Sequence, residues 1–126
     1  MRGIPLTCEL VPTGTWGANL RSLMPPSGWN RLRKSVYEDA GHKCEVCGQD
    51  GFSQNRKHAV EAHEIWVYDD IANRQILLGV QALCPRCHMA KHLGRTLKVG
   101  GADVVRAHME DINGWDEQAQ MMYEDF

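Results

Sequence analysis

The cysteines and histidines of this chain follow spacings that suit metal ions. Four cysteines form two Cys-x-x-Cys pairs, which are Cys44/Cys47 and Cys84/Cys87. The second pair runs directly into His88 and His92, which stand four positions apart. Thiolates favour a closed tetrahedral zinc site, whereas imidazoles suit ions that keep open positions for water or phosphate. The sequence therefore predicts one metal for folding and a second metal for chemistry.

The paired cysteines predict structural zinc. Each pair can occupy two corners of a tetrahedron, and the segment between Cys47 and Cys84 then forms a hairpin that the ion pins together. In an intracellular chain such pairs favour metal over disulfide, while a redox dithiol more often shows a single pair. The fifth cysteine, Cys8, has no partner motif and is predicted to be a buried or incidental thiol.

Length and composition predict one small domain. The 126 residues are few enough for a structural metal to matter. The sequence shows no long apolar run and no signal-peptide pattern at its start, which predicts a soluble cytoplasmic protein with no membrane contact. We divide it into an irregular N-terminal arm (1–27), a zinc-bound core with a preceding helix (28–100) and an acidic helical segment (101–126).

Charge is unevenly distributed. The net charge is -2, yet the residues from Asp103 onward carry -6 and the preceding 102 residues therefore carry +4. Local sign decides how a protein attracts a polyanion such as DNA. Three bases beside the histidines are predicted to contact phosphates: Arg86, Lys91 and Arg95. An ordinary solvated helix face is the alternative interpretation. The N-terminal arm and the acidic end are candidate surfaces for a protein partner.

The elements that must position these residues can be predicted from periodicity and turn signals. The order is helix, zinc knuckle, strand, loop, strand, helix and a further amphipathic helix, which makes an α+β fold. Ser27 or Asn30 can cap the first helix, Gly41 can end it, and Gly79 can mark a bulge or a close backbone approach. Gly94 and the Gly100/Gly101 pair are predicted to break the chain before the last helix. The predicted ranges are 59–68 and 75–83 for the strands, a helix start at 84–86, and 102–112 for the last helix.

Three segments, Cys44/Cys47, EAHEIW and LCPRCHMAKH, together resemble the HNH endonucleases that carry a four-cysteine zinc. The similarity covers about Cys44 to Gly94, and it includes a variant pattern, HEIW-x-YD followed by Q-x-L-x-G-x-x-A-L-C-P-x-C-H. It implies a treble-clef-like ββα-metal core with flanking N- and C-terminal helices. In that family the hairpin and helix bind one divalent ion at the scissile phosphate, and a residue of the first strand activates water. The matching metal positions here are His63, His88 and His92.

Elementary chemistry agrees with this assignment. Histidines four apart on a helix present two nitrogens from one face, and His63 on a facing strand completes a site with open positions. Without His88 and His92, His63 would be interpreted as a hydrogen-bonded histidine of the core. The sequence departs from the family where Glu64 stands in place of the usual histidine base and Gly79 in place of the usual Asn. Glu64, next to His63, is therefore the predicted base or water-orienting residue. Alternatively, Glu64 is a metal ligand, and Glu61 or a metal-bound hydroxide supplies the nucleophile.

The sequence thus predicts a metal-dependent HNH-type endonuclease that hydrolyses or nicks DNA. Its expected cofactors are structural Zn²⁺ and a catalytic divalent ion, Mg²⁺, Mn²⁺, Ni²⁺ or Zn²⁺. The alternative is a non-catalytic, zinc-stabilised module that binds nucleic acid or protein on the same scaffold. No DNA-reading helix pair or finger array is visible in the sequence, so weak or structure-dependent recognition of DNA is expected.

Overall fold

A computed structural model describes residues 6–9, 19–69 and 71–125. Across these ranges the protein is α+β, with six helices and one antiparallel sheet of two strands. The elements in chain order are α1 (Leu20–Leu23), α2 (Pro26–Asp39), the 3₁₀ turn η2 (Phe52–Gln54), β1 (Glu61–Asp69), β2 (Arg74–Leu83), α3 (Pro85–Lys91), α4 (Leu93–Val99), α5 (Ala102–Asn113) and α6 (Glu117–Glu124).

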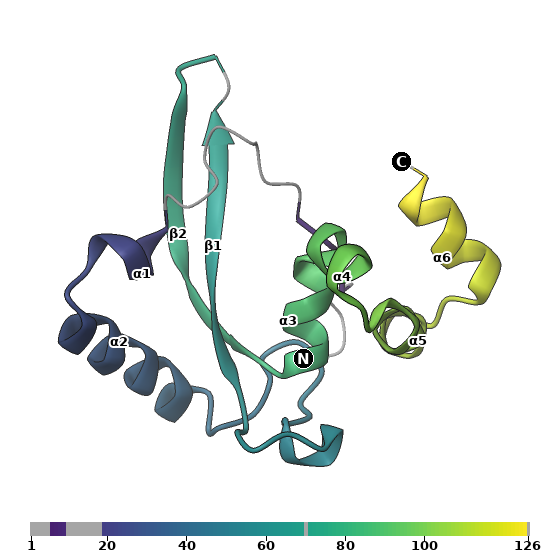
Figure 1. The fold of residues 1–126 in the computed structure, drawn as a ribbon, viewed down its shortest axis with the longest axis horizontal. Helices are drawn as coiled ribbons and strands as arrows, with labels where there is room; N and C mark the ends of the chain where they lie inside the picture. Colours follow the sequence, from purple (N-terminus) through teal and green to yellow (C-terminus); the bar gives the residue numbers. More distant parts are fainter. Residues whose placement is uncertain (1–5, 10–18, 70, 126) are drawn as a thin grey trace.

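The hairpin of β1 and β2 stands between two groups of helices. Figure 1 shows α1 and α2 on one side of it and α3 to α6 on the other. The helix α2 contacts both strands, α3 contacts both strands from its own side, and α5 packs on α3. This arrangement places the start of α3 at the base of the hairpin, where the second cysteine pair lies.

The pairing of β1 with β2 contains one irregularity beside Gly79. Ile65 pairs with Gly79 and Trp66 pairs with Leu77, so Leu78 is an extra residue in β2. This is the bulge predicted from Gly79, and a Cβ at that position would meet nothing within 4 Å. The glycine thus accompanies a change of register, and no close backbone approach requires it.

The first predicted helix forms, but its start differs from the prediction. It begins at Pro26, with Pro25 as the N-cap, and not after a side-chain cap at Ser27 or Asn30. Proline fits the first turn of a helix because its missing N–H would have no helical partner there. After the C-cap Ala40, Gly41 adopts a φ of 66°, the left-handed conformation that was predicted for it.

The predicted break at Gly94 is wrong. Gly94 lies inside α4, and the helical path is interrupted at His92, which has φ -110° and ψ 49°. His92 is the C-cap of α3 and the residue immediately before α4. Thr96 stabilises this junction because its hydroxyl donates to the carbonyls of Met89 and His92. The Gly100/Gly101 break is present between α4 and α5, with positive φ at both glycines.

The hydrophobic core is built around the cysteines. Its central members come from the N-terminal segment, the turns that carry the first cysteine pair, the end of β2 and the facing sides of α3 to α5, and all of them are buried. They are Leu6, Cys44, Val46, Cys47, Leu83, Cys84, Cys87, Ala90, Leu93, Val105 and Met109. A core that is one third cysteine has little apolar volume, so whatever the thiols bind contributes strongly to stability.

The N-terminal arm predicted over residues 1–27 lies partly outside the described residues. Within it, residues 6–9 pack against the α3 side of the molecule and α1 occupies Leu20–Leu23, so the arm is not wholly irregular. None of the described helices has the length and apolar character needed to cross a membrane.

Candidate metal centres

The four paired cysteines converge on one buried point. Cys44 and Cys47 lie in the turns after α2, Cys84 is the N-cap of α3, and Cys87 is in its first turn. The sulfurs lie within 4.8 Å of one another. Zn–S bonds of about 2.3 Å at tetrahedral angles separate sulfurs by about 3.8 Å, and the Cys47 and Cys84 sulfurs are 3.6 Å apart. A disulfide would require about 2.05 Å, so the geometry fits a zinc ion.

Backbone amides support the thiol cluster as expected for zinc knuckles. The N–H of Gln49 points at Cys47 Sγ and that of Cys87 points at Cys84 Sγ, each at 3.4 Å. Gly48 allows the first of these turns through its φ of 77°. Donated N–H bonds stabilise thiolates, which are the form that binds zinc.

The thiols influence one another's protonation strongly. A hydrogen bond from Cys47 lowers the pKa of Cys44 to about 6, and hydrogen bonds from Cys44 and Cys47 likewise lower the pKa of Cys84. The pKa of Cys47 and the pKa of Cys87 are raised by the same crowding. Four sulfurs this close cannot all ionise without a cation among them. A cation at the centre of the donor set would allow all four thiols to bind as thiolates.

His108 is a neighbour of the thiol cluster that sequence analysis did not identify. It is 5 % exposed, comes from α5, and its Nε2 lies 3.2 Å from Cys87 Sγ. A ring N–H here donates to the sulfur and reduces its negative charge. No spacing signal links it to the cysteines, because the contact depends on how α5 packs against α3.

The three predicted histidines form a second cluster. His63 comes from β1, His88 from α3, and His92 from the α3–α4 junction. One ligand nitrogen of each lies within 4.8 Å of the others, and the ring centroids are 5.1 to 5.3 Å apart. His63 is 2 % exposed, while the other two are partly exposed. Nitrogen donors of this number and spacing fit one ion that keeps an open side.

Electrostatics keep the cluster ready for a cation. Burial, followed by the charges of His88 and His63, lowers the pKa of His92 to about 4. His92 is therefore neutral at physiological pH and keeps a lone pair for a metal. Three imidazoles at this distance repel as imidazolium ions, and a bound metal in place of protons removes that repulsion.

Two carboxylates contact the histidine cluster without belonging to it. Glu61 accepts a hydrogen bond from His88 Nδ1 at 2.9 Å, and Glu9 accepts one from His63 Nε2 at 3.0 Å. Neither carboxylate is among the ligand atoms that lie within 4.8 Å of one another. The sequence predicts Glu61 only as an alternative source of the nucleophile, and no spacing signal points to Glu9, which is 54 positions from His63.

Glu64 has partners on the opposite face of β1 from His63. Its carboxylate accepts hydrogen bonds from the backbone N–H of Leu20, the first residue of α1, and from Trp66 Nε1 at 3.2 Å. Neighbouring residues of a strand point to opposite faces. Among the described residues, Glu64 is not a member of the histidine cluster. Its catalytic role stays a prediction, and its observed contacts join α1 to the sheet.

The three predicted phosphate contacts separate into two locations. Lys91 Nζ lies 3.8 Å from Glu9 Oε2, and the charge of Arg95 acts on His92, so both bases lie at the histidine cluster. Arg86 is two residues before His88, which places it about 200° around the helix. There it lines a cavity of about 240 Å³ between α3 and α5, together with Arg56.

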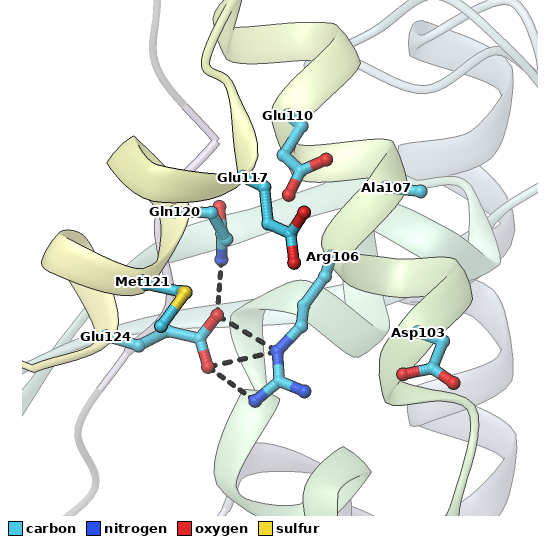
Figure 2. Close-up of a pocket in the computed structure, with 8 residues that line it drawn as sticks. All are labelled: Asp103, Arg106, Ala107, Glu110, Glu117, Gln120, Met121 and Glu124. Carbon is cyan, nitrogen blue, oxygen red and sulfur yellow. Dashed lines mark hydrogen bonds and ion pairs between the residues drawn. The ribbon is translucent and has the colours of Figure 1, made fainter.

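A larger concavity lies between α5 and α6. It has a volume of about 460 Å³, and Figure 2 shows carboxylates from both helices around it. Arg106 donates through Nε and Nη2 to Glu124, at distances from 2.7 to 3.1 Å, and Gln120 donates to the same carboxylate. The three-histidine cluster contributes none of its lining residues, so this pocket is separate from the metal centres.

No protein family model matches the chain, and no curated protein and no solved structure matches it either.

Proposed function

We propose that this chain is a small metal-dependent HNH-type endonuclease that hydrolyses or nicks DNA. One observation carries the proposal: a single short helix, α3, holds one half of a four-cysteine cluster at its start and two of three clustered histidines at its end. A hairpin supplies the third histidine, His63. This is the combination expected of a zinc-pinned, treble-clef-like ββα-metal fold.

The residues divide the proposed work between two sites. The cysteines hold structural Zn²⁺, which fixes the end of β2 and the start of α3. His63, His88 and His92 hold a divalent ion, which when bound polarises a phosphate oxygen and offsets charge on the leaving oxygen. Glu61 holds His88 through Nδ1, which leaves Nε2 with the lone pair that binds the ion. Partial exposure of two of the histidines leaves access for a phosphate.

Water activation needs a base, and the chain offers two carboxylates for it. The sequence predicts Glu64, whereas its contacts with Leu20 and Trp66 point away from His63. Glu61 lies on the His63 face, and its pKa is affected first by burial, which raises it, but is lowered overall by hydrogen bonds from His88 and His58. A lowered pKa keeps Glu61 ionised and able to orient water. Both Glu61 oxygens are hydrogen-bonded, one to His88 Nδ1 at 2.9 Å and the other to His58 Nε2 at 2.6 Å, so it is the location of Glu61 beside His88 that favours it for this role.

Substrate contacts follow from the location of the bases. Arg95 is exposed and close to His92, and Lys91 lies across Glu9 from His63. Both suit phosphates beside the proposed ion. Arg86 suits a phosphate farther along the bound DNA strand, because it lines the α3–α5 cavity.

A non-catalytic binding module is the second candidate function. It is favoured by the hydrogen bonds that occupy Glu64 and by the net negative charge of the C-terminal helices, which suits a basic protein partner better than DNA. The N-terminal arm is the other proposed partner surface, and most of it lies outside the described residues.

Cleavage of supercoiled plasmid by the zinc-replete protein tests the first candidate. Reactions contain Mg²⁺, Mn²⁺ or Ni²⁺, beside a reaction with EDTA. The informative variant is His88→Ala, and His42→Asn is the matched control because His42 is exposed and has a φ of 58° that Asn tolerates. Zinc content and circular dichroism verify folding of each protein.

Metal-dependent nicking that is abolished by His88→Ala and retained by His42→Asn is the expected outcome. Parallel Glu61→Gln and Glu64→Gln variants test the base, and because Glu61 also holds His88, the role is assigned only to a carboxylate whose loss abolishes cleavage while metal binding at the histidines stays as in the wild type. A folded, zinc-replete protein that cleaves neither plasmid nor single-stranded DNA would overturn the enzyme and leave the binding module.

A further inference from the structure

The short N-terminal segment formed by residues 6–9 is held by the C-terminal helices. Leu6 is fully buried, its N–H donates to Asn113 Oδ1 at 2.6 Å, and Asn113 Nδ2 donates back to the Leu6 carbonyl at 2.9 Å. The N–H of Cys8 donates to the hydroxyl of Tyr123 at 2.8 Å. Contacts of this kind from both α5 and α6 fix the path of the segment.

The same segment ends on the histidine cluster. The backbone N–H of Glu9 donates to the carbonyl of Lys91 at 2.8 Å, which ties it to the end of α3. The Glu9 side chain, 30 % exposed, then reaches His63 with one oxygen and Lys91 Nζ with the other, at 3.0 and 3.8 Å. A residue far away in the sequence is thus built into the site by three contacts.

The hydrogen bond fixes which nitrogen of His63 can bind a metal. An ionised carboxylate only accepts hydrogen bonds, so His63 Nε2 must carry the proton and Nδ1 keeps the lone pair. Glu61 does the corresponding work for His88, where Nδ1 carries the proton. Metal-binding histidines are commonly oriented by a carboxylate on the other ring nitrogen. Two of the three histidines therefore have such a partner.

We propose that Glu9 is the positioning residue for His63, and that docking of residues 6–9 on α5 and α6 is coupled to metal binding at the three-histidine cluster. This inference rests on the metal site of the proposed function, but not on nuclease activity. Coupling is reciprocal: if the docked segment strengthens metal binding, then bound metal stabilises the docked segment. The C-terminal helices thereby influence a site to which they contribute no ligand.

Cobalt titration of protein loaded with only one zinc per chain, at the thiol cluster, measures the first half of this coupling. Zinc keeps the thiols occupied, so a visible Co²⁺ spectrum without thiolate charge-transfer bands reports the histidines. Glu9→Gln keeps the size of the side chain but removes its charge, and Asn113→Ala releases the segment without touching the cluster. Glu38→Gln, on the exposed side of α2, is the matched control.

Loss of an orienting partner weakens metal binding by about 10- to 100-fold, and this is the expected effect of Glu9→Gln. The spectrum of the bound Co²⁺ should also change, while zinc content and thermal unfolding stay as in the wild type. A merely structural role for Glu9 would not change the spectrum under these conditions. Asn113→Ala should weaken binding in the same direction, and Glu38→Gln should have no effect.

Hydrogen exchange measures the second half. Added Co²⁺ should slow exchange of the Leu6, Cys8 and Glu9 amides, all of which donate hydrogen bonds in the docked segment.

Glu9→Gln with wild-type affinity and spectrum would overturn the role of Glu9, even if the wild type binds cobalt and cleaves DNA. If the wild type binds cobalt but never cleaves DNA, the proposed nuclease activity is rejected and the proposed coupling still stands. If the wild type takes up no cobalt at the histidines, the site and the coupling are both overturned.

Discussion

Cys84 is the residue on which most of the local structure depends. It follows the last residue of β2, it is the N-cap of α3, and it is fully buried among the other thiols. Cys84→Ser should leave the protein with weak zinc binding and a loss of more than about 4 kcal/mol in the free energy of unfolding, as expected when a structural metal is lost. Zinc stoichiometry and urea unfolding measure this.

Cys8→Ser is the matched control for that substitution, because Cys8 is a thiol outside the cluster that contacts Tyr123. It should keep one zinc per chain at the thiol cluster. Equal zinc content in the two variants would contradict the four-cysteine site.

His108 allows a finer test at the thiol cluster. A zinc-bound Cys87 thiolate can only accept, so His108 would donate to it through Nε2. Loss of such a partner typically weakens metal binding by about tenfold or more. His108→Ala should therefore release zinc to a chelator at lower chelator concentration, whereas His108→Gln, which keeps an N–H donor, should retain most of the affinity. If both variants match the wild type, the contact with Cys87 has no effect on the metal.

Among the elements, α5 and α6 are joined by the ion pair of Arg106 with Glu124. Arg106, through its hydrogen bond, is the main cause of the lowered pKa of Glu124. A lowered folded-state pKa means that the pair stabilises the protein above the unfolded pKa of about 4.3, and that this contribution is lost as the pH falls through the folded value. Arg106→Gln should cost about 0.5 to 1 kcal/mol at pH 7.

Two measurements check that pH dependence. Urea unfolding gives the free-energy difference at pH 7, and an NMR titration of the Glu124 carboxyl carbon should show a higher pKa in Arg106→Gln than in the wild type. An unchanged Glu124 pKa would exclude Arg106 as its cause. Asp103→Asn serves as a control, because it lies in the same pocket without a hydrogen bond to Glu124 among those drawn in Figure 2.

Element-scale prediction from the sequence succeeded where the signal was local. The apolar run before Cys84, the Pro85 start of α3 and the glycines after α2 each report on their own neighbours, and β2, α3 and the end of α2 form as expected. Gly94 misled because an isolated glycine is tolerated in a helix when the neighbouring residues pack well. The break occurs at His92, where the hydroxyl of Thr96 satisfies carbonyls.

Across the whole molecule, the sequence could not supply those long-range contacts that no residue spacing constrains. The cysteine and histidine clusters were predictable because zinc and helix spacing constrain them, and both clusters form. Glu9 on His63 and His108 on Cys87 depend on how terminal segments dock, and no periodicity records that. The alternation of β1 does separate Glu64 from His63, but only the observed contacts with Leu20 and Trp66 show where its carboxylate is used.

Folding of the whole chain should depend on a metal ion held by the four clustered cysteines. Zinc bound to small thiolate sites contributes about 10 to 16 kcal/mol of apparent binding free energy, whereas the stability of a domain is about 5 to 15 kcal/mol. The cysteines also form the centre of the core. When the ion is removed, repulsion between their thiolates destabilises that core. A strong zinc chelator at neutral pH should therefore unfold the protein.

Circular dichroism and dispersion of the NMR spectrum should be lost together on chelation, and added Zn²⁺ should restore both. Because protons compete with zinc for the thiols, acid lowers zinc affinity, and less chelator should be needed as the pH falls. His88→Ala should need as much chelator as the wild type, since His88 belongs to the histidine cluster and not to the thiol cluster. A chelated protein that keeps its native spectrum would show that the core holds without the ion, and that the four thiols serve another purpose.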